Sequence, residues 1–231
     1  MTRKMHATRT GLLLGIGMLV WGGQSLAPAE AQQTSISPYV AVRAHGASLE
    51  HECDFSNNRV TRKVRDCDSK ERIGGGLGVG AEVAKRYVVE LEYMVNQGGD
   101  YRSYWAPFNA NQQVIKVGTV HTGLLNLGYK FGIGDAFSLT PLASAGWTHV
   151  EVGGLQAAAS NFKSKTNDSF AWGAGLLLGY DFAKNMELQF GYRYVDLGEA
   201  ESGISDFDPR DERFKGNLTA HIVQVGLKYK F

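Results

Sequence analysis

The last eight residues, Gln224-Val225-Gly226-Leu227-Lys228-Tyr229-Lys230-Phe231, alternate between apolar and polar side chains without a slip. Side chains of a strand point to opposite faces with a period of two, so this segment is predicted to be a strand with one apolar and one polar face. Such a strand at a chain end needs a partner, because an unpaired apolar edge promotes aggregation. Closure of a barrel would supply that partner.

The N-terminal residues have the pattern of a secretory signal peptide. A basic region is followed by an apolar stretch, Gly11–Trp21, and by an A-x-A cleavage pattern at Ala29-Glu30-Ala31. The alternative is a transmembrane helix, but the apolar stretch is shorter than the ~20 residues that a span requires. We therefore predict a signal peptide over residues 1–31 and a single domain over residues 32–231.

Charge and hydropathy restrict the partners of the mature chain. Cleavage after Ala31 would remove three basic residues and one acidic residue, changing the formal charge from +1 to −1. No strong charge bias remains, so nucleic acid is not an expected partner. Nothing after residue 31 is long and apolar enough for a membrane helix, but barrel strands give only weak hydropathy signals.

The two cysteines are Cys53 and Cys67. In an exported protein such a pair usually forms a disulfide, which here would close a loop of about fifteen residues and contribute about 3 kcal/mol. The alternative is a metal site that also uses His45 or His51, although four ligands at tetrahedral spacing are not evident. We predict one bridge that staples one loop, and neither a metal nor another cofactor.

Alternation and turn residues predict eight strands in the mature chain. They lie near Pro38–Ala47, Ile73–Ala84, Tyr87–Asn96, Val114–Phe131, Ala136–Val150, Ser169–Phe182, Met186–Gly198 and Asn217–Phe231. Their connections alternate between short turns and long loops, the long ones being 48–72, 98–113, 153–168 and 199–216. Short turns at one end and long loops at the other are typical of an outer-membrane barrel. The predicted fold class is all-β: an eight-stranded antiparallel up-and-down transmembrane barrel.

The volume of the side chains predicts which face points outward. One face carries many large apolar groups, among them Leu91, Tyr93, Leu125, Phe170, Phe190 and Tyr194. These groups would overfill an eight-stranded interior, which is just wide enough for side chains to fill it. The opposite face is rich in glycine, which suits a crowded lumen. We therefore expect the apolar face to meet lipid, with closure satisfying every strand edge in hydrocarbon.

Three strands that run toward the short-turn end finish with an aromatic-x-aromatic pattern. The pairs are Tyr129/Phe131, Tyr180/Phe182 and Tyr229/Phe231. Rings at one height on several strands predict half of an aromatic girdle at a membrane interface.

The predicted lumen face carries five acidic and five basic residues. They are Glu82, Glu90, Glu92, Asp181 and Glu187 against Arg43, Lys130, Arg193, Lys228 and Lys230. Isolated charges in a narrow interior are costly, so we expect them to pair and to plug the barrel. The alternative is a water-filled pore in which most of these charges are hydrated.

Motifs that carry chemistry are mostly absent. The glycines of Gly74–Gly80 recur inside a predicted strand and have no helix after them, so they do not indicate a dinucleotide site. His121, His149 and His221 lie on strands near the loop end. We interpret them as rim residues, although some outer-membrane enzymes use a rim histidine beside Ser or Asp. We therefore predict that the chain is not an enzyme.

The second predicted loop contains four aromatic residues among polar ones, Tyr101, Tyr104, Trp105 and Phe108. Exposed aromatic side chains without a core to join favour contact with a partner, with lipopolysaccharide or with another loop. The alternative is that they extend the outer aromatic girdle.

Two predicted strands and the C-terminal residues resemble those of a known family. The stretches Leu188–Gly198 and Phe170–Phe182 look like the corresponding strands of small opacity-type, OmpA-like outer-membrane proteins. Gln224, Gly226, Tyr229 and Phe231 resemble the signal that the outer-membrane insertion machinery reads. The resemblance implies a bacterial outer-membrane location, with outer-membrane lipid, lipopolysaccharide and that machinery as partners. No peptidoglycan-binding domain follows Phe231 in this sequence, so we do not expect a cell-wall anchor.

The resemblance is specific for fold and location but not for activity, because this family includes adhesins, immune-evasion proteins, structural anchors and small pores. We expect a closed barrel that displays four long extracellular loops to a host or surface ligand. The first alternative is a small porin for ions or small solutes. The second is an outer-membrane enzyme that acts on lipid A or on peptides.

Overall fold

The computed structural model describes residues 35–52, 54–56, 61–63, 69–102, 113–156, 160–206 and 211–231. These residues form a thirteen-stranded sheet in which every pairing is antiparallel. In this part of the chain, no helix is long and apolar enough to cross a membrane. The signal peptide expected at residues 1–31 lies outside these ranges.

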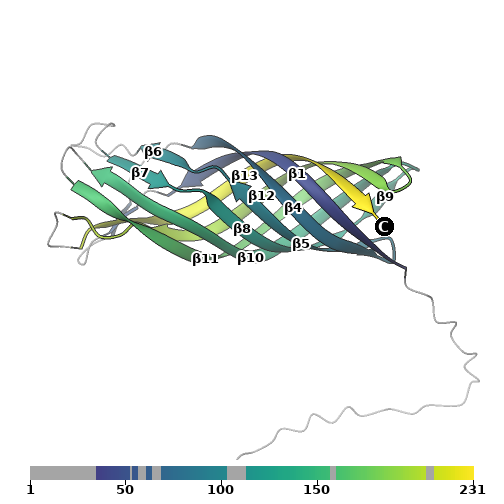
Figure 1. Cartoon of the computed structure of the whole chain (residues 1–231), viewed down its shortest axis with the longest axis horizontal. Helices are drawn as coiled ribbons and strands as arrows, with labels where there is room; N and C mark the ends of the chain where they lie inside the picture. Colours follow the sequence, from purple (N-terminus) through teal and green to yellow (C-terminus); the bar gives the residue numbers. More distant parts are fainter. Residues whose placement is uncertain are drawn as a thin grey trace, which may run out of the picture. The chain divides into compact units, whose positions relative to one another are not determined.

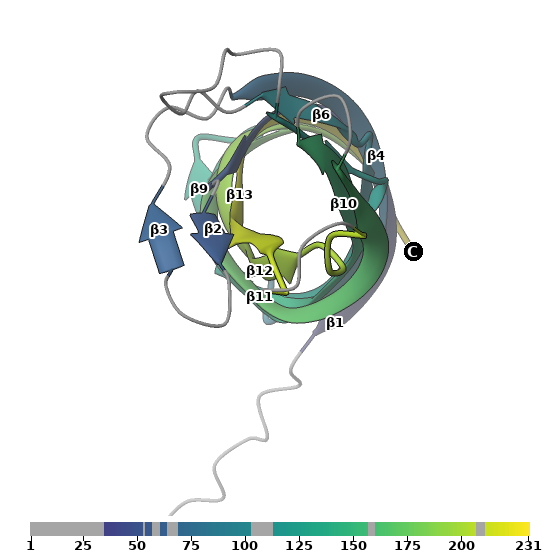
Figure 2. The ribbon, with the colours of Figure 1, turned by 90° about the vertical axis from the view of Figure 1, so that its left-hand side faces the viewer.

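Long strands form the wall of a closed eight-stranded barrel, which confirms the predicted fold class (Figures 1 and 2). They are β1 (Ile36–His51), β4 (Lys70–Val83), β5 (Tyr87–Asn96), β8 (Val120–Tyr129), β10 (Phe137–Gln156), β11 (Ser160–Ala183), β12 (Met186–Glu201) and β13 (Arg213–Lys230). β1 pairs with β4 on one side and with β13 on the other. The predicted terminal strand is therefore the one that closes the barrel.

Short strands complete the sheet. They are β2 (Asp54–Ser56), β3 (Thr61–Lys63), β6 (Gly99–Arg102), β7 (Gln113–Val117) and β9 (Phe131–Ile133). β2 pairs with β13 and with β3, and Figure 2 shows both beside the ring of long strands. β7 pairs with β6 and with β10.

The predicted strand limits lie within two residues of the observed ones at the short-turn end, whereas at the loop end several strands are longer than predicted. The predicted strand Val114–Phe131 is divided into β7, β8 and β9. The predicted loop 153–168 is wrong, because β10 and β11 remain paired up to Gln156↔Ser160. Buried inward side chains such as Val152 and Phe162 give these strand ends a core to pack against, which a solvated loop would lack.

The outward face of the barrel is apolar around its circumference. Its exposed large side chains include Val42, Leu77, Leu91, Leu125, Phe170, Leu176, Phe190 and Val225. At the short-turn end, aromatic rings pair between and along strands: Tyr87 with Tyr129 at 5.4 Å between ring centroids, and Tyr229 with Phe231 at 5.3 Å. An apolar band of this kind bordered by rings is what a membrane-spanning barrel presents to lipid.

Toward the loop end, the polarity of the two faces is exchanged. On β13 the outward residues change from apolar Val223, Val225 and Leu227 to polar Asn217, Thr219 and His221. The buried inward residues change from Gln224 and Lys228 to Leu218, Ala220 and Ile222. The barrel therefore has a lower part that is apolar outside and polar inside, and an upper part with the opposite arrangement.

We predict that Leu125→Arg lowers the stability of the barrel in lipid bilayers by about 2–4 kcal/mol, because this position faces the middle of the hydrocarbon. Leu125 lies halfway between Tyr129 of the lower ring belt and His121 of the loop-end border. The matched control is Thr219→Arg, which faces outward above the apolar band and should cost about 0–1 kcal/mol. Urea titration of folding into lipid vesicles measures both, and equal costs would contradict the assigned orientation.

Candidate functional site in the barrel interior

Acidic and lysine side chains meet inside the barrel near the short-turn end. Lys228 Nζ lies 3.0 Å from Glu82 Oε1 and 3.1 Å from Glu187 Oε1. Lys130 Nζ lies 2.6 Å from Glu187 Oε2 and 3.1 Å from Glu82 Oε1. Lys230 adds contacts of 2.6 Å to Asp181 and 2.9 Å to Glu187. Three lysines thus neutralise three acids, and we call this group the lower cluster.

A second group, the middle cluster, is built around two arginines. Arg43 donates both Nη atoms to Glu90, at 2.8 Å and 2.7 Å, and donates Nη1 to Glu92 at 3.0 Å. Arg193 donates to the other oxygen of Glu92 at 2.6 Å. Asn126 donates to Glu90 at 2.9 Å and to Glu92 at 2.7 Å. Both carboxylates are therefore held by several charge-assisted hydrogen bonds, which are stronger than neutral ones.

Gln189 joins the two clusters. Its Oε1 accepts from Arg43 Nη2 at 3.2 Å, and its Nε2 donates to Glu187 Oε1 at 2.8 Å. All ten charged residues predicted for the lumen consequently belong to one connected network. Gln189 and Asn126 were not predicted as lumen residues, although alternation places both on the inward face of their strands.

Glycines on the inward face make room for this network. A Cβ atom at Gly226 would lie 2.8 Å from Cγ of Arg43, and one at Gly78 would lie 2.9 Å from the carboxylate of Glu90. A side chain at Gly226 would meet the stem of Arg43 and the Val42 carbonyl, so the bulk of Arg43 favours glycine there, and a side chain at Gly78 would displace the Glu90 carboxylate from its pair with Arg43. Gly226, which is also predicted to be part of an assembly signal, therefore has a packing role.

Little space remains around the middle cluster. A cavity of about 10 Å³ is lined by Arg43, Glu90, Asn126, Gln189 and Lys228, among other residues. A volume of that size holds about one water molecule.

An apolar core fills the upper part of the interior. It includes Leu49, Ile115, Val120, Val152, Leu197, Phe214, Leu218 and Ile222. The rings of Phe162 and Phe214 lie 4.3 Å apart between centroids. This core was not predicted, because charged residues and glycine were expected along the whole lumen. The sequence of β13 does indicate this core. Ile222, Ala220 and Leu218 follow Gln224 at intervals of two residues and therefore lie on the same inward face.

Tyr101 was expected to be an exposed loop aromatic, but it is fully buried and belongs to the upper core. It lies on β6, whose alternation turns this ring inward. Burial raises the pKa of Tyr101 to about 12. The other predicted loop aromatics, Tyr104, Trp105 and Phe108, lie outside the described residues, as do Cys53 and Cys67.

The outer surface of the upper part carries ion pairs. Glu201 pairs with Lys165 and lies 3.6 Å from Arg213, while Lys215 lies 2.8 Å from Glu199. Burial raises the pKa of Glu201, but the hydrogen bond and charge of Lys165 outweigh it, so this pKa lies below its ordinary value. These pairs are partly exposed and contribute little to stability compared with the interior network.

The three histidines noted in the sequence lie at the border between the apolar band and the upper part. Nδ1 of His121 lies 2.7 Å from the Tyr93 hydroxyl. Nδ1 of His149 lies 2.7 Å from a carboxylate oxygen of Asp168, and both of these side chains are largely exposed. In the described ranges, no group of three or more His, Cys, Asp or Glu residues is arranged to hold a metal ion.

Comparisons with known proteins agree with this architecture. A family model described as the outer membrane protein beta-barrel domain matches residues 16–231. OprG from Pseudomonas aeruginosa is 14% identical, with 84% of this chain and 96% of that chain covered and a TM-score of 0.54. A major outer membrane protein from Thermus thermophilus is 13% identical, with 84% and 99% covered and a TM-score of 0.53. A search of curated proteins gives no match. Identities this low show a common fold alone.

We predict that Glu92→Gln lowers the free energy of unfolding by about 3–5 kcal/mol, because it leaves buried Arg43 and Arg193 without their shared counter-charge. The matched control is Glu201→Gln, which removes a partly exposed pair with Lys165 and should cost about 0–1 kcal/mol. Urea unfolding in detergent micelles measures both variants. Equal effects would show that the interior network does not stabilise the barrel.

Proposed function

The chain belongs to the family of outer membrane protein beta-barrel domains, and from this premise we propose that it is a closed barrel that acts through its extracellular end. Its location is the bacterial outer membrane. The observation that carries the proposal is the filling of the interior by two chemically different layers. A barrel without a passage exposes only its outer wall and its ends to other molecules.

The two layers support a closed lumen in different ways. In the lower part, the network from Lys230 to Arg193 pairs every predicted lumen charge, so few charges are left to attract water or a passing ion. In the upper part, apolar side chains such as Phe214 and Leu218 exclude water by dewetting. A solute would have to displace both layers.

The upper part supports a role in surface contact. β10 and β11 have 20 and 24 residues, whereas a transmembrane β-strand needs about 9–11 residues. The excess lies at the loop end, where the outward residues are polar and the interior is packed. The loop ends of β10 and β11 lie beyond the apolar band, and binding residues are found disproportionately on segments positioned by such a scaffold, which favours contact with a host or surface ligand.

The two alternative functions, a small porin and an outer-membrane enzyme, can each be distinguished from a closed barrel. A small porin would need a passage beside the paired charges. An enzyme acting on lipid A or on peptides would have the pair His149–Asp168 as its best base, since that pair lies at the membrane border. An altered lipid A mass spectrum in cells that lack the protein would favour the enzyme.

We predict that the purified barrel gives no sustained open state in planar bilayers and does not accelerate the swelling of liposomes in sugars. A positive control combines Glu92→Ala and Arg193→Ala with Phe162→Ala and Phe214→Ala, which removes side chains from both layers. The combined variant should conduct more than the unmodified barrel, because it thins both layers while the lower cluster stays in place. A large and steady open state in the unmodified protein would exclude the closed barrel and favour the porin.

We predict that trimming the extension weakens adhesion of cells that display the protein. In the trimmed variant, an Asn-Gly turn replaces residues 152–165, because Glu151 and Thr166 are paired and can be joined by a two-residue hairpin. Adhesion is measured on epithelial monolayers, on serum-coated plastic and on bare plastic, at surface levels matched by labelling. Equal adhesion of both strains on all three surfaces would argue against a display role.

A further inference from the structure

Two histidines lie side by side on the outer wall of the barrel, on the adjacent strands β8 and β10. His121 and His149 are direct partners in the register of these strands, and both face outward at the border between the apolar band and the upper part. Side chains directly opposite in an antiparallel pair start from Cβ atoms about 4.5–5.5 Å apart. The centroids of the two rings lie 6.5 Å apart. A small rotation of these outward side chains therefore brings both imidazoles to one ion.

Each of the two rings is held by its Nδ1 atom. His149 Nδ1 lies 2.7 Å from Asp168 Oδ1, and an ionised carboxylate only accepts hydrogen bonds, so the neutral ring has its proton on Nδ1. His121 Nδ1 lies 2.7 Å from the Tyr93 hydroxyl, whose oxygen can accept a hydrogen bond in the same way. The lone pair of Nε2 is then left for another partner in both rings, and the described residues supply none.

The surroundings of the pair are those of metal-bound histidines. A histidine that binds a metal through one nitrogen almost always donates its other N–H to a carboxylate, a carbonyl or water, which fixes the ring and makes the ligating nitrogen more basic. Asp168 and Tyr93 offer such oxygens from the flanking strands β11 and β5. The two partners therefore hold the histidine pair from both sides, and the carboxylate adds a negative charge that favours a cation.

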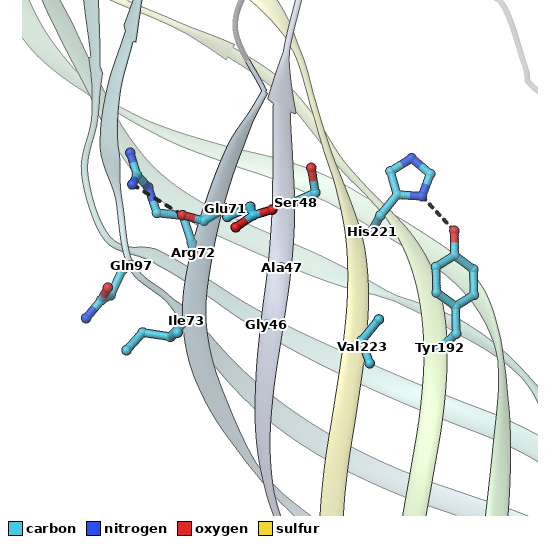
Figure 3. A pocket seen from close by; sticks show the side chains of 10 residues that line it. All are labelled: Gly46, Ala47, Ser48, Glu71, Arg72, Ile73, Gln97, Tyr192, His221 and Val223. Carbon is cyan, nitrogen blue, oxygen red and sulfur yellow. Dashed lines mark hydrogen bonds between the residues drawn. The ribbon is translucent and has the colours of Figure 1, made fainter.

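His221 on β13 has a similar partner but belongs to no such pair. Its Nδ1 lies 2.7 Å from the Tyr192 hydroxyl, which Figure 3 shows as a dashed line. The ten described residues that line the adjoining hollow include no second histidine. A tyrosine-bonded imidazole thus occurs here without a neighbouring ligand, so this position provides a comparison for the pair on β8 and β10.

We propose that His121 and His149 bind one divalent transition-metal ion through their Nε2 atoms. Asp168 and Tyr93 position the two rings, and water completes the coordination. Imidazole nitrogen suits Cu²⁺, Ni²⁺ and Zn²⁺, with Cu²⁺ bound most tightly, whereas Mg²⁺ and Ca²⁺ prefer oxygen ligands. Because only two ligands come from the protein, the ion exchanges with the medium and is not a resident cofactor. The inference depends neither on the closed lumen nor on the display role proposed above.

Isothermal titration calorimetry of the detergent-solubilised mature barrel with CuCl₂, ZnCl₂ and MgCl₂ tests the proposal. The unmodified protein should bind one Cu²⁺, bind Zn²⁺ more weakly and give no binding heat with Mg²⁺. Electron paramagnetic resonance of the Cu²⁺ complex should show coupling to two imidazoles. Asp168→Asn should keep this signal and weaken the affinity for Cu²⁺ roughly tenfold, because it removes the charge that orients His149. His121→Asn and His149→Asn should each weaken the affinity further and lose the signal of the second imidazole.

The matched control is His221→Asn, which removes an outward histidine bonded to a tyrosine hydroxyl and should leave the affinity for Cu²⁺ unchanged. Resistance of the folded band to detergent before heating shows that each variant forms a barrel. Three results would overturn the proposal: unchanged affinity in the double variant His121→Asn/His149→Asn, an equal loss in His221→Asn, or coupling to a single imidazole in the unmodified protein. The first of these would show that the ion binds adventitiously elsewhere. An unchanged affinity of Asp168→Asn would exclude its positioning role.

Discussion

Closure of β13 against β1 is the constraint on which the rest of the structure depends. In hydrocarbon every backbone donor and acceptor needs a partner, and the pairing from Tyr39↔Lys230 to His51↔Leu218 supplies those partners at the last open edge. Closure with antiparallel pairing also fixes the phase of alternation on every strand, because a slip by one residue turns each side chain to the other face. The position of Arg43 opposite Gly226 is one result of that fixed phase.

The interior and the exterior are complementary at every height. Where large apolar groups such as Leu125 and Phe190 face outward, the interior holds ion pairs, and glycines compensate for their volume. Where polar groups such as Thr219 and His149 face outward, the interior holds an apolar core. The upper part thus resembles a water-soluble barrel built on a membrane-spanning one. Apolar burial stabilises the upper part, whereas in the lower part the ion pairs compensate for the desolvation of the charges that fill the lumen.

The sequence was sufficient for the fold and for the charged members of the interior network, because period-two alternation depends only on local order. The limits of β5 at Tyr87 and Asn96 agree with the prediction for the same reason. The sequence was insufficient in the upper part, where the apolar residues of each strand face inward instead of outward. Phe162 was assigned to a loop, and Tyr101 to an exposed surface, because apolar residues beyond the membrane band have no lipid to face. Only the pairing of β10 with β11 and β7 shows that they share a core.

Export gives a physical reason for this exchange of faces. A segment that is apolar on both faces risks retention in the inner membrane, where each central Asp, Lys or Arg disfavours insertion by about 2.5–3.5 kcal/mol. Inward charges such as Glu90, Glu92 and Lys228 provide that protection in the lower part, and outward polar residues provide it in the upper part. With 43% hydrophobic residues and a mean hydropathy of −0.22, the chain has the composition of a water-soluble protein. The position of the membrane border is therefore determined by which face of each strand carries the apolar residues, and not by the number of apolar residues.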